Sequence, residues 1–201
     1  MAVVTALRSA GSGDRVRVEL DGTLWRTLPL EVVIRAGLAT GRPLERAQLR
    51  VLGRELRRHE ALRASTGALR HRDLSSRELE ERLRRRDVAP ADRDAAIEAL
   101  RSAGLLDDER AARSRARSLA ERGYGNAAIR ADLERRGVAG ETIEAAVCEL
   151  EPESERAAAV VVRRGGGAST ARLLARRGFA EDVVETAMAA EAGMDDPLAL
   201  P

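Results

Sequence analysis

The spacing of apolar and polar positions changes once along the chain. Near its start, apolar residues alternate with polar ones in R-V-R-V-E-L and T-L-W-R-T-L, and a period of two predicts β-strands. Asp21 and Gly22 stand between these segments, and this dipeptide supplies the positive φ angles that a type I′ hairpin turn needs. We therefore predict a β-hairpin, to which Val3 to Leu7 could add a third strand.

A two-residue turn determines which residues of the two strands face each other. The expected pairs are Leu20 with Thr23, Val18 with Trp25 and Val16 with Thr27. One face of the hairpin would then carry most of its apolar side chains.

From Pro29 onward the period becomes helical. Leu30, Val33, Ile34 and Leu38 are spaced as one helix face, and after G-R-P the residues Leu44, Leu49, Leu52 and Leu56 mark another. The remaining chain is expected to contain only helices and turns, and the breaker-rich segment at its end to be mobile.

One short pattern occurs three times in the helical part. The strings are L-R-R-R-D-V from Leu83, L-E-R-R-G-V from Leu133 and L-A-R-R-G-F from Leu174. In each, a helix ends at paired arginines, the chain turns at Asp87, Gly137 or Gly178, and a second helix packs back. Further helices are expected upstream, over residues 60–69, 109–121 and 155–164, so that each unit contains three.

We predict a mainly α fold in which three tandem three-helix repeats follow a small N-terminal module that contains the β-hairpin. The expected divisions are residues 1–60 for this module, 61–112, 113–153 and 154–192 for the repeats, and 193–201 for a mobile tail. A three-helix unit of about 40 residues buries little apolar surface by itself, and tandem units share their faces.

Composition adds limits on function. All 35 basic residues are arginine, and the net charge is only +2. Without lysines little titrates above neutral pH, so the high sequence pI of about 9.4 is weak evidence for nucleic-acid binding. The apolar run in M-A-V-V-T-A-L-R is short for a signal peptide, and no apolar run approaches the length of a membrane span, so we expect a cytoplasmic protein.

No catalytic, cofactor or metal site is expected. His59 and His71 lack acid or cysteine partners at metal-ligand spacing. Cys148 is expected to be buried on an apolar helix face, and Gly165 to Gly167 to form a bend. Asp107 or Asp108 is expected to cap the helix that follows, not to bind a metal.

The arginine clusters at the three turns are the candidate partner-binding residues. They are Arg84, Arg85, Arg86, Arg135, Arg136, Arg176 and Arg177. Each cluster could simply be a neutralised helix end, since acids precede several of these arginines by four positions. Equivalent positions in stacked repeats line up, however, so the clusters could form a basic stripe that binds an acidic groove or phosphates.

A helix-turn-helix DNA reader is the structural alternative. The second helices begin with P-A-D-R-D, A-G-E-T-I-E and A-E-D-V-V-E, and acids at these positions would repel phosphates. Sequence-specific reading is therefore disfavoured. Non-specific DNA contact through the arginines remains the alternative function.

Longer strings resemble a known family. These are E-A-L-R-S-A-G-L-L-D-D-E-R-A-A-R from Glu98, R-G-Y-G-N-A-A-I-R-A-D-L-E-R-R-G-V from Arg122, the L-D-G turn and S-S-R-E-L-E-E-R-L. Together and in this order they resemble the RecX regulatory proteins of bacteria. The resemblance implies a non-enzymatic modulator that binds the RecA recombinase filament in its groove and usually restrains it. We expect it to act as a monomer.

Overall fold

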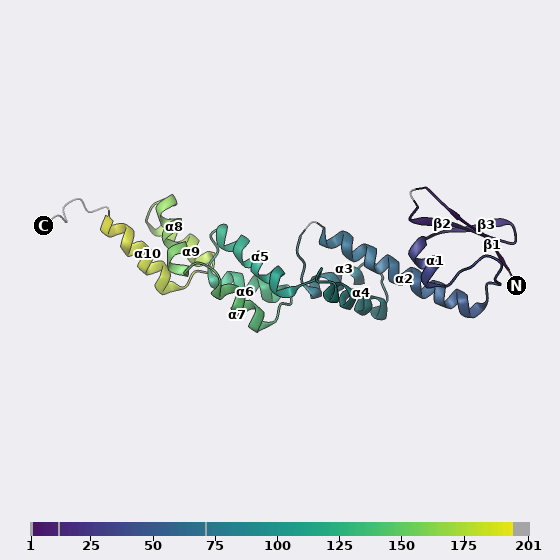
Figure 1. The fold of residues 1–201 in the computed structure, drawn as a ribbon. Coiled ribbons are helices and arrows are strands. Elements are labelled where there is room, and N and C mark those ends of the chain that lie inside the picture. The colour runs from purple at the N-terminus through teal and green to yellow at the C-terminus, as the bar shows by residue number, and fades with distance from the viewer. Residues whose placement is uncertain (1, 12, 71, 195–201) are drawn as a thin grey trace. The chain divides into compact units, whose positions relative to one another are not determined.

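A computed structural model describes residues 2–11, 13–70 and 72–194. The chain divides into two compact units. The first comprises Met1–Gly67 with Arg82–Leu100, and the second comprises Ala68–Glu81 with Arg101–Pro201. The fold is mainly helical with one small sheet, and its helices follow a tandem three-helix arrangement (Figure 1).

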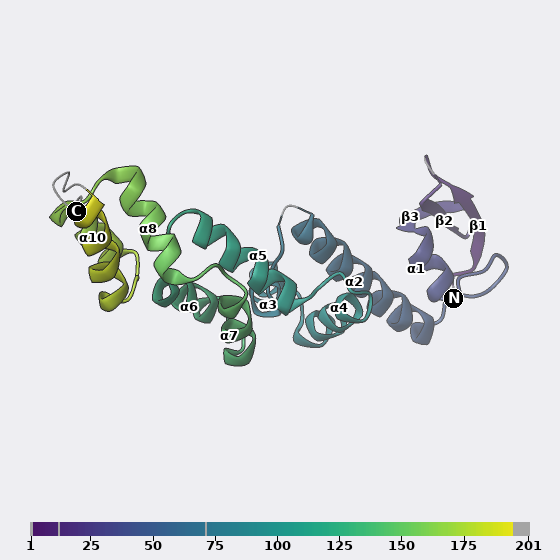
Figure 2. The same ribbon diagram turned by 60° about the vertical axis from the view of Figure 1, so that its left-hand side comes forward.

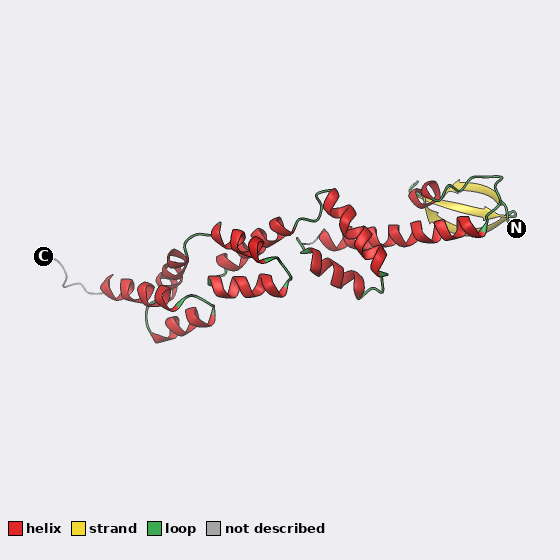
Figure 3. Ribbon diagram, turned by 90° about the horizontal axis from the view of Figure 1, so that it is seen from below, coloured by secondary structure: helices red, strands yellow, loops and turns green. Residues whose placement is uncertain are grey.

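The predicted β-hairpin is present in the first unit, together with the third strand (Figure 3). Strands β1 (Val4–Ser9), β2 (Arg15–Leu20) and β3 (Thr23–Pro29) form an antiparallel sheet in the order β1-β2-β3. Asp21 and Gly22 have φ angles of 48° and 81°, as a type I′ turn requires. Leu20 lies opposite Thr23, as predicted.

The rest of the predicted register is wrong by one residue. Val18 pairs with Arg26 and Val16 pairs with Leu28, because a bulge at Trp25 inserts one extra residue into β3. Val16, Val18 and Leu28 are consequently all buried. The alternation of apolar and polar residues does not reveal this one extra residue in β3, because Val16 and Val18 of β2 share a face in the predicted register and in the observed one.

The helices of the first unit differ from the predicted faces. Helix α1 (Leu30–Arg35) buries Val32 and Val33, whereas Leu30 and Ile34 are 39% and 67% exposed. Helix α2 (Arg46–Leu69) is continuous across the predicted division between residues 60 and 61. The core consists of apolar residues from the sheet, from both helices and from the segment that connects the helices: Val4, Val16, Val18, Leu28, Val32, Val33, Ala36, Leu38, Leu44 and Leu52.

The repeated helices have the following bounds. They are α3 (Ser76–Arg84), α4 (Pro90–Ser102), α5 (Asp108–Glu121), α6 (Asn126–Arg135), α7 (Gly140–Cys148), α8 (Glu153–Arg164), α9 (Ala168–Arg176) and α10 (Glu181–Met194). Figure 2 shows α5, α6 and α7 grouped together. The predicted division between residues 112 and 113 falls inside α5. We refer to α5–α7 as the second repeat and to α8–α10 as the third.

The repeated leucines form the centres of the repeats. Leu83, Leu133 and Leu174 are buried, as are the residues four positions earlier, Leu79, Ile129 and Thr170. Asp87, Gly137 and Gly178 have φ angles of 56°, 71° and 76°. The predicted left-handed turns are therefore confirmed in all three repeats.

Two other expectations have opposite outcomes. Gly165 ends α8 with a φ of 79°, and residues 165–167 connect α8 to α9, which confirms the predicted bend. Cys148 is exposed, so its predicted burial is wrong. Helix α7 turns Ile143, Ala146 and Val147 inward, and a residue directly after Val147 points about 100° away from it.

Two predictions concern residues outside the described ones, namely His71 and most of the tail, residues 195–201. Within the ranges that the structure describes, no helix combines the length and apolar character needed to cross a membrane.

Candidate partner-binding surface

The two arginines of a turn have different environments. In the second repeat, Arg135 is 70% exposed and Arg136 is 21% exposed. In the third repeat, Arg176 is exposed and Arg177 is partly buried. The sequence predicts the pairs as a uniform basic cluster, but the structure separates an outer first arginine from an inner second arginine.

The remaining cluster lies in the first unit, where α3 ends. Arg84, Arg85 and Arg86 are all exposed. This cluster precedes Asp87, whose left-handed φ of 56° ends the helix as the glycines do elsewhere. All three turns therefore present arginine to solvent.

The inner arginine of the second repeat holds that repeat against the start of α3 through its backbone. The Ser75 hydroxyl donates to the carbonyl oxygen of Arg136 at 2.7 Å. The Ser76 N–H donates to a carboxylate oxygen of Asp108, the first residue of α5, at 2.6 Å. Both bonds satisfy polar groups at the N-terminus of α3, where a helix has unpaired N–H donors.

The same arrangement recurs between the second and third repeats. The Gly125 N–H donates to the carbonyl oxygen of Arg177 at 2.8 Å. The Asn126 N–H donates to Glu153, the first residue of α8, at 2.6 Å. When the repeats are aligned, residues 125 and 126 correspond to residues 75 and 76. We call each of these two sets of contacts an inter-repeat joint.

Glycine is required at the second joint because two backbones touch there. A Cβ at Gly125 would lie 2.3 Å from the carbonyl carbon and oxygen of Gly178. A Cβ at Gly178 would lie 2.5 Å from the backbone nitrogen of Ala128. The turn glycine therefore serves close packing as well as its left-handed conformation.

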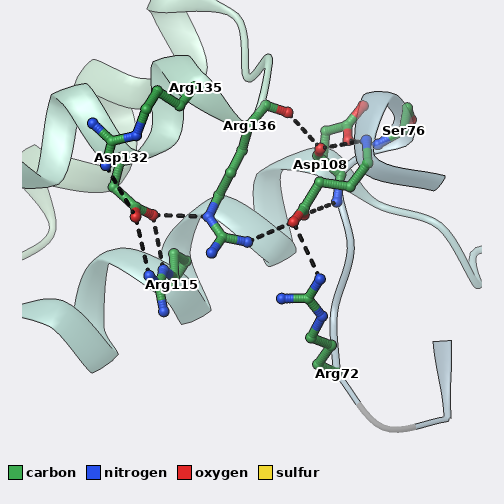
Figure 4. A network of polar contacts seen from close by, with 9 residues as sticks. Arg72, Ser76, Asp108, Arg115, Asp132, Arg135 and Arg136 are labelled. Carbon is green, nitrogen blue, oxygen red and sulfur yellow. Dashed lines mark hydrogen bonds and ion pairs between the residues drawn. The ribbon is translucent and has the colours of Figure 1, made fainter. Parts of the chain in front are cut away.

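The side chains at the first joint form an ion network (Figure 4). Asp132 accepts two bonds from Arg115, at 2.8 and 3.0 Å, and one from Arg136 at 2.8 Å. Arg136 also donates to Glu78 at 2.6 Å, and Arg72 lies 3.4 Å from the same carboxylate. The hydrogen bonds from Arg115, with those from Arg136, hold the pKa of Asp132 well below its usual range.

Glu78 also caps α3. The Ser75 N–H donates to Glu78 and the Glu78 N–H donates to the Ser75 hydroxyl, at 3.1 and 3.2 Å, which is a capping box. The first joint thus couples the cap of one repeat to the turn of the next.

The side chains at the second joint are chemically different. Arg156 is 6% exposed and donates to the carbonyl oxygens of Glu151 and Tyr124 and to the side-chain oxygen of Asn126. Its guanidinium also lies 6.0 Å from the ring centre of Phe179. Burial among these neutral groups lowers the pKa of Arg156.

Arg177 completes this joint. Its guanidinium lies 5.6 Å from the ring centre of Tyr124 and 3.4 Å from the carbonyl oxygen of Gly123. Sequence reasoning did not identify Arg156 as important, since it lies outside the repeated string. The sequence offers one signal for Arg156: when the second and third repeats are aligned, it stands at a helix position that the second repeat fills with Ala111.

The second helices of the repeats begin with acidic residues, as the argument against sequence-specific DNA reading requires. The first turns of α4, α7 and α10 contain Asp92, Glu141 and the pair Glu181 and Asp182. Carboxylates there suit the positive end of the helix dipole and would repel DNA phosphates.

One of the residues considered as a chemical candidate, Asp107, has a structural role. Asp107 caps α5 by accepting from the Arg110 N–H at 2.9 Å, which selects it over Asp108 as the cap. His59 lies 3.6 Å from Glu31. Among the residues that can be described, no group of three His, Cys, Asp or Glu could hold a metal ion.

Comparison with known proteins gives one consistent family. A model of the second three-helix domain of RecX matches residues 107–147. The regulatory protein RecX of Halorhodospira halophila (strain DSM 244 / SL1) is 37% identical over 142 residues, which cover 65% of this chain and 88% of that protein. The regulatory protein RecX of Xanthomonas campestris pv. campestris (strain B100) is 34% identical over 99 residues, or 49% of this chain. The match spans 61% of that relative's length.

Solved structures agree on the fold. A crystal structure of regulatory protein RecX superimposes with a TM-score of 0.78 at 20% identity, covering 93% of this chain and 98% of that one. A crystal structure of RecX from Lactobacillus salivarius gives a TM-score of 0.60 at 18% identity, covering 68% and 97%. At such identities the likeness concerns the fold.

Substituting Gly125 by Ala tests the close approach at the second joint. Gly125 has an ordinary φ of −80°, so only the clash with Gly178 opposes the methyl group. We expect Gly125→Ala to lower the free energy of unfolding by about 2 to 3 kcal/mol, measured by denaturant titration. Gly140→Ala is the matched control, because its Cβ would meet nothing within 4 Å. Equal midpoints for the two variants would contradict the packing described.

Substituting Asp132 by Asn tests the ion network. The variant should be about 2 kcal/mol less stable than the wild type at pH 7, because Arg115 and Arg136 lose a charged acceptor. Folding lowers the pKa of Asp132, so its contribution is complete above the unfolded value of about 3.9 and is lost as the pH falls below it. The stability difference between the wild type and the variant should therefore shrink steadily as the pH is lowered from 4 to 2.

The control for this experiment is Glu144→Gln. Glu144 forms a similar two-bond pair with Arg130, at 2.8 and 2.9 Å, but it is exposed and lies within one repeat. Because solvent screens this exposed pair, we expect the free energy of unfolding of that variant to stay close to that of the wild type at pH 7 and at pH 2. A gap between wild type and Asp132→Asn that does not depend on pH would refute the role of the carboxylate charge.

Proposed function

Because the chain belongs to the RecX family of regulatory proteins, we propose that it binds the RecA recombinase filament in its groove and restrains it. The restraint would act on recombination, on ATP hydrolysis by the filament and on SOS-related activity. In this proposal the chain works as a monomer in the cytoplasm, in DNA repair and recombination, and performs no chemistry of its own.

One observation supports this function most strongly. The outer arginine recurs at the same repeat position, as Arg135 and Arg176. Each repeat that carries it is held to the preceding one through the carbonyl oxygen of the adjacent inner arginine. A joint that fixes one repeat on the next also fixes the spacing of these two positive charges. Charges held at a fixed spacing suit a partner that presents the same acidic feature repeatedly, as a filament does.

The affinity would come from several weak contacts. A single exposed arginine contributes little by itself. When two or more arginines are held at a spacing that matches the partner, the first contact brings the others close to their binding sites. The later contacts then form within the same complex, and the total affinity exceeds that of any single contact. Each of the three repeats would contribute one cluster.

The seven predicted arginines then have two tasks. Arg84, Arg85, Arg86, Arg135 and Arg176 are exposed and would contact the partner. Arg136 and Arg177 would support binding through the joints, since their side chains and carbonyl oxygens are engaged there.

Non-specific DNA binding is the competing function. The same exposed arginines could contact phosphates, and such binding would weaken steeply with added salt. The acids that begin α4, α7 and α10 argue against reading of base sequence.

Removing the outer arginines tests the proposal. We expect Arg135→Gln and Arg176→Gln each to weaken binding to RecA filaments by about tenfold, and the double variant by about a hundredfold. Glutamine removes the charge without placing a second carboxylate near Asp132, which lies 3.5 Å from Arg135. Binding would be measured with filaments assembled on single-stranded DNA, alongside inhibition of ATP hydrolysis.

Two exposed arginines outside the turns, Arg50 and Arg163, provide the matched control. The double variant Arg50→Gln with Arg163→Gln has the same net charge and should bind like the wild type. Equal weakening in both double variants would point to a general charge effect. Tight binding of the wild type to naked DNA at physiological salt, with no effect on filaments, would favour the competing function.

A further inference from the structure

A row of arginines runs along the first half of α2. Arg46, Arg50, Arg54 and Arg58 stand four residues apart, and all four are exposed. Because an α-helix rises about 1.5 Å per residue, the row is about 18 Å long. Residues four apart lie on the same side of a helix, and the opposite side of α2 is buried through Leu52 in the core of the first unit. We call these four arginines the α2 ridge.

The ridge has no acidic partners. Within the residues that the structure describes, none of its four guanidinium groups forms an ion pair or a hydrogen bond. The acids of the same segment, Glu45, Glu55 and Glu60, form no ion pair there either. Arg57, which adjoins the ridge, is different, because it donates to Asp92 of α4 at 3.2 Å. The ridge therefore presents four uncompensated positive charges to solvent.

The ridge also carries much of the positive excess of the chain. Residues 1–60 contain 11 arginines and 7 acidic residues, whereas the rest of the chain contains more acids than arginines. The net charge of +2 therefore comes from the first 60 residues. Four of those 11 arginines form the ridge, so α2 concentrates this excess on one helix face.

Helix stability does not explain the row. Like charges four positions apart repel each other on a helix surface. Arg46 is also the first residue of α2, whose first turn contains no acid, and a cation at that end opposes the helix dipole. An exposed arrangement that works against the local rules of folding is typical of a functional surface. The ridge therefore indicates a binding site for an anion.

Phosphates fit the ridge better than other anionic groups. The centre of a protein–protein interface is typically apolar and rich in aromatic residues, and single-stranded nucleic acid is held by bases that stack on aromatic rings. The three aromatic residues of the chain, Trp25, Tyr124 and Phe179, all lie outside α2. A guanidinium instead binds a phosphate through paired, charge-assisted hydrogen bonds. Duplex DNA offers such phosphates at regular spacing along its backbone.

An anionic membrane surface fits less well. A helix that binds a membrane inserts its apolar face among the lipids. The apolar face of α2 is not available for this, because Leu52 is 5% exposed and Leu56 packs against the same core. Charge alone would then hold the chain on the membrane.

We propose that the α2 ridge binds the phosphate backbone of duplex DNA. Its length of about 18 Å corresponds to about five base pairs at roughly 3.4 Å each. Each arginine neutralises one phosphate, and the affinity comes from the release of cations condensed on the DNA. The ridge is separate from the turn arginines, and filaments assembled on single-stranded DNA offer it no duplex. Duplex binding and filament binding can therefore fail independently.

Binding of the full chain to a labelled duplex, measured by fluorescence anisotropy, tests this inference. The test variant replaces all four ridge arginines by glutamine: Arg46→Gln, Arg50→Gln, Arg54→Gln and Arg58→Gln. At about 100 mM salt we expect it to bind at least tenfold more weakly than the wild type. The logarithm of the association constant should also fall less steeply with the logarithm of the salt concentration, by about 3 to 4 in slope, because each phosphate contact contributes about 0.9.

Two matched variants separate local charge from net charge and from folding. Arg117→Gln, Arg163→Gln, Arg164→Gln and Arg172→Gln together remove four exposed arginines outside α2 and outside the turns, and should leave duplex binding close to that of the wild type. Lysine at the four ridge positions keeps the charges and should keep the salt dependence. The glutamine variant of the ridge should melt at the wild-type temperature or above it, because like charges no longer repel along α2.

The inference is overturned if the two glutamine variants lose duplex binding equally, or if the lysine variant loses it as well. A ridge glutamine variant that melts well below the wild type would assign the row a structural role instead. Displacement of the labelled duplex by polyglutamate, or by vesicles of phosphatidylglycerol, as effectively as by unlabelled duplex would indicate a protein or a membrane partner and would also overturn it.

Discussion

A single carbonyl oxygen, that of the second arginine in the turn, fixes how one helical repeat sits on the one before it. At Arg136 it accepts from the Ser75 hydroxyl, and at Arg177 it accepts from the Gly125 N–H. The carbonyl reaches its donor because a left-handed glycine follows it and ends the helix. Repeats of about 40 residues bury too little surface to be stable alone, so the fold and any function that needs fixed spacing depend on these contacts.

The two joints share their acceptors, which are the carbonyl oxygen of the inner arginine and the carboxylate of the residue that begins the next helix, and they differ in the side chains around them. The first joint depends on charge, with Asp132 held between Arg115 and Arg136. The second depends on burial, with Arg156 bonded to neutral oxygens and facing Phe179. Salt and acid act mainly on exposed or paired charges, so they should loosen the first joint before the second. The same two acceptors can therefore hold repeats together in different chemical surroundings.

Much of the fold could be predicted from sequence because its signals are local. The Asp21-Gly22 turn, the buried leucines at Leu83, Leu133 and Leu174, and the left-handed turns all follow from spacing within a few residues. The failures depend on contacts between distant residues or on one inserted residue. The bulge at Trp25 shifts the hairpin register, and packing decides that Ile34 is exposed while Val32 is buried. The separation of Arg135 from Arg136 also depends on distant residues, because Glu78 and Ser75 belong to another repeat.

The central claim is that the paired arginines divide into an inner residue that holds a joint and an outer, exposed residue that we propose contacts the partner. Arginine-selective labelling, followed by mass spectrometry of the folded chain, tests it most directly. We expect Arg135 and Arg176 to be modified at least tenfold faster than Arg136 and Arg177, and RecA filaments to slow only the outer pair. Equal rates within each pair in the absence of the filament would contradict the account.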